Sequence, residues 1–169
     1  FKHRGFMIKV EHILFITPTV KLQFNLSQAI CLCAWIAIGR SALWWENLKD
    51  YGLDDANRMI QVGGLRVSGL CRGGMFTLEN QLSQNILDNN KKAVDEAVAI
   101  HAECLVMVVG GLKPNSKDLI GSRKQMEEGL FKTLEYARTV KMPIGIEPLH
   151  PMYEADRAGG NTLKYALDI

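Results

Sequence analysis

An acidic residue and an imidazole stand close together after an apolar segment near the carboxyl end of the chain. Residues 144–146 are Ile-Gly-Ile, and Glu147 and His150 follow, with Pro148 and Pro151 stiffening the backbone around them. In parallel α/β folds, ligands bind beyond the carboxyl ends of the strands. We therefore take Glu147 and His150 as candidate catalytic residues, with Glu147 acting as a metal ligand or as a base.

The residues that follow strengthen this interpretation. A Glu at a strand end, taken alone, is more often a solvated or ion-paired surface residue. Here Asp156, Arg157 and Asn161 come close behind His150, so several polar groups gather after one strand. Arg157 is a candidate for substrate binding, with pairing to Asp156 as the alternative.

A second candidate lies at residues 71–74, Cys-Arg-Gly-Gly, after another apolar run. The two glycines let the backbone approach a ligand closely, and the Arg72 guanidinium can hold a carboxylate or phosphate in a fork. A turn with a solvated Arg explains the same residues equally well. Trp45, at the end of an earlier predicted strand, offers an apolar wall for a substrate, with core packing as the equal alternative.

Alternating strand and helix patterns must position these residues. Runs rich in apolar and β-branched residues predict five strands, near residues 12–18, 39–45, 65–70, 104–109 and 144–149, with helix-period patterns between them. Such alternation predicts a parallel sheet with right-handed crossovers. Asn25 or Ser27 is predicted to cap the first helix, Asp54 the second and Asn161 the last.

Composition narrows the class of protein. The chain has 169 residues, 47% hydrophobic and 22% charged, which is typical of one globular domain. Its net charge of +2 is spread along the sequence, so no nucleic-acid partner is expected. Residues 29–38 form an apolar run too short to cross a bilayer, which predicts a buried helix and no membrane partner. Cys31, Cys33, Cys71 and Cys104 lie in apolar runs without chelate spacing, and no secretory signal is visible, which predicts reduced core cysteines in a cytoplasmic protein.

Motifs along most of the chain carry a resemblance to a known family. The specific ones are Cys-Arg-Gly-Gly at 71–74 and Glu-Pro-Leu-His-Pro-Met-Tyr at 147–153. The sequence resembles the sugar phosphate isomerase/epimerase family, the xylose-isomerase-like TIM barrels of the AP endonuclease family 2 superfamily. The resemblance implies an α/β fold, the (β/α)8 TIM barrel, of which this chain would supply about the first five strands and four helices, since a closed barrel usually needs about 250 residues. Residues 7–169 would then be a partial barrel truncated after the fifth strand, and residues 1–6, before Met7, a non-native extension.

The resemblance also implies a metal centre. In this family, one divalent cation is held by a carboxylate from the fifth strand and by ligands from the sixth, seventh and eighth. Glu147 matches the first of these and would be the only metal ligand in this chain, for Mn²⁺, Mg²⁺, Co²⁺ or Zn²⁺. His150 can ligate the metal, bind a substrate hydroxyl or orient Glu147, and its place on a Pro-flanked loop favours the last two roles.

The implied activity is that of a metal-dependent isomerase or epimerase, which moves a proton next to the carbonyl of a small-molecule sugar through an enediolate. The resemblance leaves room for a homo-oligomer. An inosose-dehydratase-like lyase would use the same metal and base, and an inactive sugar-binding fragment is a third interpretation. Some epimerases of this fold carry a second acid shortly after the metal ligand, where this sequence has Tyr153 and then Glu154. The AP-endonuclease relatives fit less well, because they place histidines where this chain has residues 71–72 and 110–111.

Overall fold

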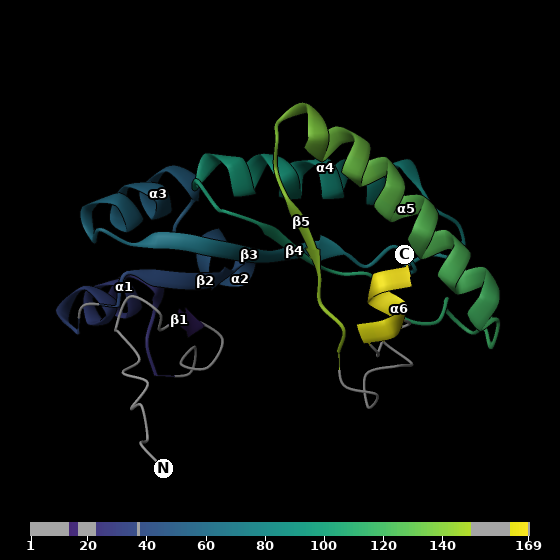
Figure 1. Cartoon of the computed structure of the whole chain (residues 1–169), viewed down its shortest axis with the longest axis horizontal. Helices are drawn as coiled ribbons and strands as arrows, with labels where there is room; N and C mark the ends of the chain where they lie inside the picture. Colours follow the sequence, from purple (N-terminus) through teal and green to yellow (C-terminus); the bar gives the residue numbers. More distant parts are fainter. Residues whose placement is uncertain (1–13, 17–22, 37, 150–162, 169) are drawn as a thin grey trace, which may run out of the picture. The chain divides into compact units, whose positions relative to one another are not determined.

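Parallel strands alternate with helices along the chain (Figure 1). The computed structural model describes residues 14–16, 23–36, 38–149 and 163–168. In chain order the elements are β1 (Leu14–Ile16), α1 (Leu26–Trp35), β2 (Arg40–Trp44), α2 (Trp45–Lys49), α3 (Leu53–Val62), β3 (Arg66–Gly74), α4 (Gln84–Ala99), β4 (Leu105–Val108), α5 (Leu119–Thr139), β5 (Ile144–Ile146) and α6 (Leu163–Asp168). They fall into two compact units, Phe1–Ser68 and Gly69–Ile169, and β3 runs from one into the other.

In the first unit, β1 and β2 are parallel, with Leu14 opposite Arg40. The start of β3 continues beside β2, where the Arg66 N–H donates to the Gly39 carbonyl at 2.9 Å. Helix α1 packs against α3. The apolar side chains that these two helices bury are Leu26, Ala29, Ile30, Cys33, Ala56 and Ile60.

The start of the first helix confirms one of the two predicted caps. The Asn25 side chain accepts from the Gln28 N–H at 2.9 Å, and the Gln28 side chain accepts from the Asn25 N–H at 3.0 Å, which makes a capping box. The prediction for Asp54 was wrong. Helix α3 begins after Gly52, and Asp54 lies in its first turn, where a carboxylate favours the positive end of the helix dipole. Asn161 lies outside the described residues.

The helix predicted from the apolar run 29–38 is present but is not buried all round. Cys33 is 1% exposed, whereas Trp35 is 84% exposed and Cys31 is also exposed. An unbroken apolar run shows no helical period, so the sequence could not tell the exposed side of this helix from its buried side. The prediction of core cysteines therefore holds for Cys33, is wrong for Cys31, and is half right for Cys71 and Cys104, which are half-buried. All four are free thiols.

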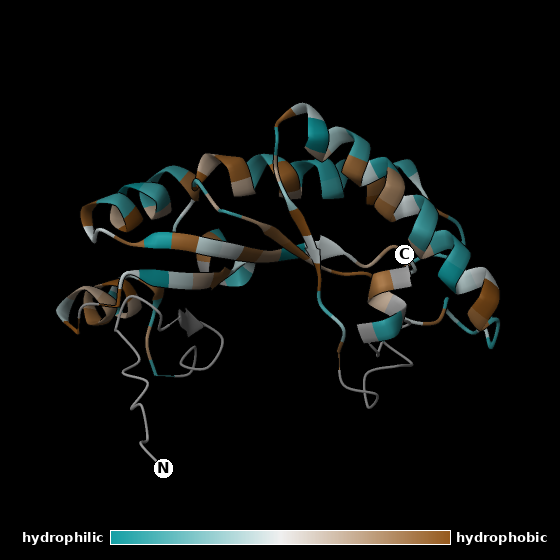
Figure 2. Cartoon of the chain, viewed as in Figure 1, coloured by the Kyte–Doolittle hydropathy of each residue, from teal (hydrophilic) through white to brown (hydrophobic). Residues whose placement is uncertain are grey.

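In the second unit, β3, β4 and β5 are parallel and follow chain order. Leu70, Leu105 and Met107 are fully buried, and a Cβ built on Gly73 would touch both Met107 and Ala93 of α4. Helix α4 therefore covers the face of the sheet that carries these side chains. Hydrophilic and hydrophobic bands alternate along α4 and α5 (Figure 2), which is the pattern of helices with one apolar face.

All five predicted strands are present, and β3 extends beyond its predicted end to Gly74. The short helix α2, which starts at Trp45, was not predicted, since five residues are too few to show a helical period. No helix in the described part of the chain has the length and apolarity needed to cross a membrane.

Candidate functional site

The two faces of the sheet in the second unit have different surroundings. Successive residues of a strand point to opposite faces, so Cys71 lies on the face opposite Arg72. Cys71 is in register with Val106, and Val106 with Gly145. Glu147 stands two residues beyond Gly145 and belongs to the same face. We call this the open face, because Cys71, Cys104, Val106, Gly145 and Glu147 are half-buried or exposed, whereas Leu70, Leu105 and Met107 on the face under α4 are fully buried.

Glu147 is held at the carboxyl end of β5. Its N–H donates to the Met107 carbonyl at 3.0 Å, so its backbone continues the parallel ladder one step past Ile146. Its side chain is exposed. The Cys71 thiol donates to Oε2 of Glu147 at 3.6 Å, a length that suits the larger sulfur atom. The structure thus brings the Cys71 thiol of β3 to an exposed carboxylate just after β5.

The remaining predicted site residues are His150, Arg157, Trp45 and Arg72. His150 and Arg157, with Asp156, fall outside the described residues. Trp45 belongs to the first unit, where it begins α2 with a half-buried side chain and carries the Lys49 ammonium 5.3 Å from its ring centroid.

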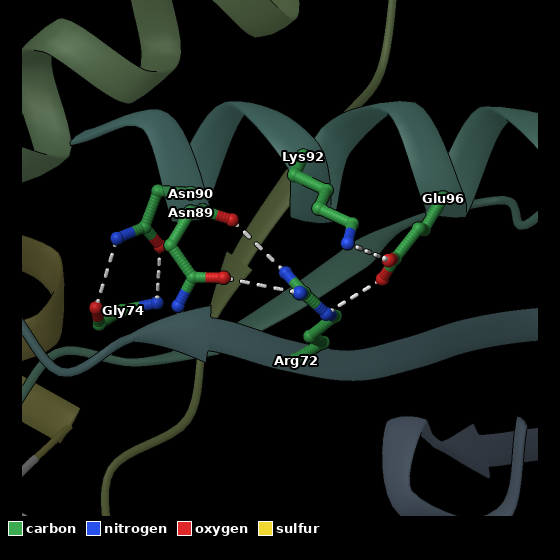
Figure 3. Close-up of polar contacts among 6 residues, drawn as sticks. All are labelled: Arg72, Gly74, Asn89, Asn90, Lys92 and Glu96. Carbon is green, nitrogen blue, oxygen red and sulfur yellow. Dashed lines mark hydrogen bonds and ion pairs between the residues drawn. The ribbon is translucent and has the colours of Figure 1, made fainter. Parts of the chain in front are cut away.

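Arg72 makes contacts that differ from the expected one with a ligand (Figure 3). Its guanidinium points at α4, where its Nε lies 2.6 Å from Oε2 of Glu96. Its other two nitrogens donate to the main-chain and side-chain oxygens of Asn89 at 3.0 and 3.1 Å. The Arg72 side chain is only 7% exposed, and burial lowers the pKa of its guanidinium while the Glu96 carboxylate opposes this change. Arg72 therefore fastens β3 to α4, and this geometry gives no support to a contact with substrate.

The structure predicts that Arg72→Ala lowers stability by about 2 kcal/mol, because the mostly buried Glu96 carboxylate loses its close cation and keeps only the Lys92 ammonium at 4.0 Å. Thermal and urea unfolding would measure the loss. Lys132→Ala is the matched control, since Lys132 pairs with Glu128 at 2.7 Å on an exposed surface and should cost less than about 0.5 kcal/mol. A loss for Arg72→Ala no larger than that of the control would contradict this assignment.

The two glycines after Arg72 let the backbone of β3 come close to the backbone of the neighbouring strand β4. Gly73 and Gly74 have φ angles of 87° and 80°, in the left-handed region, and a Cβ on Gly74 would collide with the Val108 backbone. The Asn90 side chain holds the same point, accepting from the Gly74 N–H at 2.6 Å and donating to the Gly74 carbonyl at 3.0 Å (Figure 3). The expectation that these glycines admit a ligand is thus replaced by a close approach of β3 to β4.

The donors on the open face suit one part of a metal centre. An exposed carboxylate at a strand end is a ligand type that Mn²⁺, Mg²⁺, Co²⁺ and Zn²⁺ all accept. Among the described residues, no three His, Cys, Asp or Glu side chains converge on one point. Glu147 therefore has the chemistry to serve as one ligand of such a centre.

Comparisons with known proteins agree with this architecture. The family profile described as xylose isomerase-like TIM barrel matches residues 34–169. Protein SMc04130 from Sinorhizobium meliloti 1021 is 40% identical, with a TM-score of 0.90 over 95% of this chain and 58% of that one. D-psicose 3-epimerase from Clostridium cellulolyticum H10, solved with D-tagatose, is 9% identical, with a TM-score of 0.68 over 83% of this chain and 53% of that one. The IOLI protein, solved with a zinc atom, is 19% identical, with a TM-score of 0.72 over 92% and 56%. No curated protein matches the chain.

The chain belongs to the xylose isomerase-like TIM barrel family. Its five parallel strands are consistent with part of a (β/α)8 barrel. It spans 58%, 53% and 56% of the lengths of the three solved relatives.

Proposed function

We propose that the full-length protein is a metal-dependent isomerase or epimerase that acts on a sugar or sugar derivative through an enediolate. The observation that carries the proposal is the position of Glu147. Its carboxylate is exposed at the carboxyl end of β5, on the open face, and active sites of TIM barrels lie at this end of the strands.

Glu147 is proposed to hold a divalent cation, Mn²⁺, Mg²⁺, Co²⁺ or Zn²⁺, together with ligands from other parts of the protein. When bound, such a cation polarises the carbonyl and hydroxyl oxygens of a sugar and thereby acidifies the adjacent C–H. The Glu147 carboxylate then accepts the proton from that carbon. Returning the proton to the neighbouring carbon, with a proton moved between the two oxygens, gives an isomer, whereas delivery of a proton to the opposite side of the same carbon by a second acid gives an epimer.

The remaining proposed roles fall on His150, Arg157 and Trp45. His150 is proposed to orient Glu147 or to bind a substrate hydroxyl, and Arg157 to contact the substrate. Trp45 stays a proposed apolar wall for the sugar. Arg72 is left out of the proposed machinery, because its guanidinium is engaged with Glu96 and Asn89.

Solvent proton exchange tests this function without knowledge of the natural substrate. The full-length protein with Mn²⁺ would be incubated with a panel of ketoses and aldoses in D₂O, and NMR would detect deuterium on the carbon next to the carbonyl. We expect exchange with at least one sugar, its loss after chelation and its return with Mn²⁺. A dehydrated product would instead indicate a lyase, and absence of exchange across the panel with metal-loaded protein would refute the proposal.

A further inference from the structure

The contact between Cys71 and Glu147 joins β3 to the residue that follows β5, two segments that are far apart in the sequence. Sγ of Cys71 lies 3.6 Å from Oε2 of Glu147, and the thiol is the donor. Both residues belong to the open face. The apolar run around Cys71 predicted a core cysteine, and nothing in that run distinguished Cys71 from the other three thiols.

The backbone on the Cys71 side of this contact is firmly placed. Cys71 pairs with Val106 within the sheet, and the next residue, Arg72, is fastened to α4 by Glu96 and Asn89. Two residues further on, Gly74 is bonded to the buried Asn90 side chain. The Cys71 thiol is therefore carried by a strand whose backbone is fixed in place.

The Glu147 side chain is held much less firmly than the backbone of Cys71. Its backbone N–H is fixed to Met107, but its carboxylate is exposed and is carried on a long side chain with several rotamers. Fixing such a side chain for catalysis costs conformational entropy, which a neighbouring donor reduces when it selects one rotamer beforehand. Thiols are weak donors, so the contact can select a rotamer without competing strongly for the carboxylate charge.

We propose that Cys71 is a positioning residue for Glu147. Its S–H donates to Oε2 and would leave Oε1 available for the cation that Glu147 is proposed to hold. This inference deepens the proposed function and depends on it. Partners of metal ligands in other proteins act in this way, by orienting the ligand.

The contact itself is tested by infrared spectroscopy of the S–H stretch, which needs neither metal nor substrate. Subtracting the spectrum of Cys71→Ser from that of the full-length wild type isolates the Cys71 band. We expect this band at a lower frequency than that of an unbonded thiol and expect it to rise in Glu147→Ala. An unchanged Cys71 band in Glu147→Ala would overturn the proposal.

The positioning role is tested by Mn²⁺ titration of the same full-length protein. Cys71→Ala should weaken Mn²⁺ binding by about 3–10-fold, less than is typical for partners of metal ligands, because the thiol donor is weak. Cys71→Ser, which keeps a donor, should stay within about 2-fold of wild type. Cys104→Ala is the matched control, since the Cys104 thiol donates to the Leu105 carbonyl and has a pKa raised chiefly by burial.

The outcomes separate this inference from the proposed function. Equal Mn²⁺ affinity in Cys71→Ala and Cys104→Ala would overturn the positioning role, as would an effect confined to the KM for sugar. A new charge-transfer absorption with Co²⁺ that disappears in Cys71→Ala would also overturn it, since the thiolate would then be a ligand itself. If Glu147→Gln left Mn²⁺ binding unchanged, the proposed function would fail, while the infrared band would still report the contact.

Discussion

Glu147→Gln is expected to lower kcat of the full-length protein by about 10³-fold or more, because the amide can neither accept the proton nor balance the charge of a divalent cation. The replacement keeps the shape of the side chain and its place after β5. Steady-state rates on any sugar that shows exchange in D₂O would measure the loss. Mn²⁺ titration of the same variant would show whether cation binding falls as well.

The control for this prediction is a Glu→Gln replacement at an exposed helix position away from the candidate site. Glu127 is exposed on α5, and Glu127→Gln should leave both kcat and Mn²⁺ affinity unchanged. Glu147→Gln should also melt at the wild-type temperature, because an exposed side chain contributes little packing. Near-normal turnover in Glu147→Gln would show that the proton is moved by another group.

The strand positions could be predicted from the sequence, whereas the direction of side chains at the end of β3 could not. Along β3, polar and apolar residues do not keep the regular alternation that separates one face of a strand from the other. Arg72 and Cys71 are neighbours in such a strand. Arg72 faces α4 because its guanidinium contacts Glu96 and Asn89 of that helix. These partners lie further along the chain and are not part of the local pattern of β3.

In the candidate site, too, one feature could be predicted from the local sequence and another could not. Glu147 could be found from its place after an apolar run, since the strand and its end are local features. Its contact with Cys71 depends on the register of three strands, from Cys71 to Val106 and from Val106 to Gly145. That register is fixed by the packing of the sheet and is invisible in either segment alone.

The glycine pair 73–74 illustrates how a motif can be found correctly and assigned the wrong purpose. A Gly-Gly sequence after a strand shows that the backbone comes close to something. The sequence cannot say whether that partner is a ligand or another strand. In the structure it is β4, because the N–H of Met75 donates to the Val108 carbonyl at 2.6 Å and a Cβ on Gly74 would collide with the Val108 backbone.

We therefore expect Gly74→Ala to destabilise the protein by about 4 kcal/mol. The left-handed φ of 80° costs an alanine about 1–2 kcal/mol, and the collision of the new Cβ with the Val108 backbone adds about 1–3 kcal/mol. The obstacle is main chain, which cannot rotate aside as a long side chain does. Urea unfolding would measure the loss, together with the thermal midpoint.

Gly64→Ala separates the two contributions. Gly64 has a φ of 65°, and nothing lies within 4 Å of a Cβ built on it. Its replacement should therefore cost only the conformational part, about 1–2 kcal/mol. A much larger loss at Gly74 than at Gly64 would show that the close approach of β3 to β4 requires glycine. Equal losses would mean that the strands can part at little cost, and the Asn90 side chain would then hold Gly74 less firmly than its two hydrogen bonds imply.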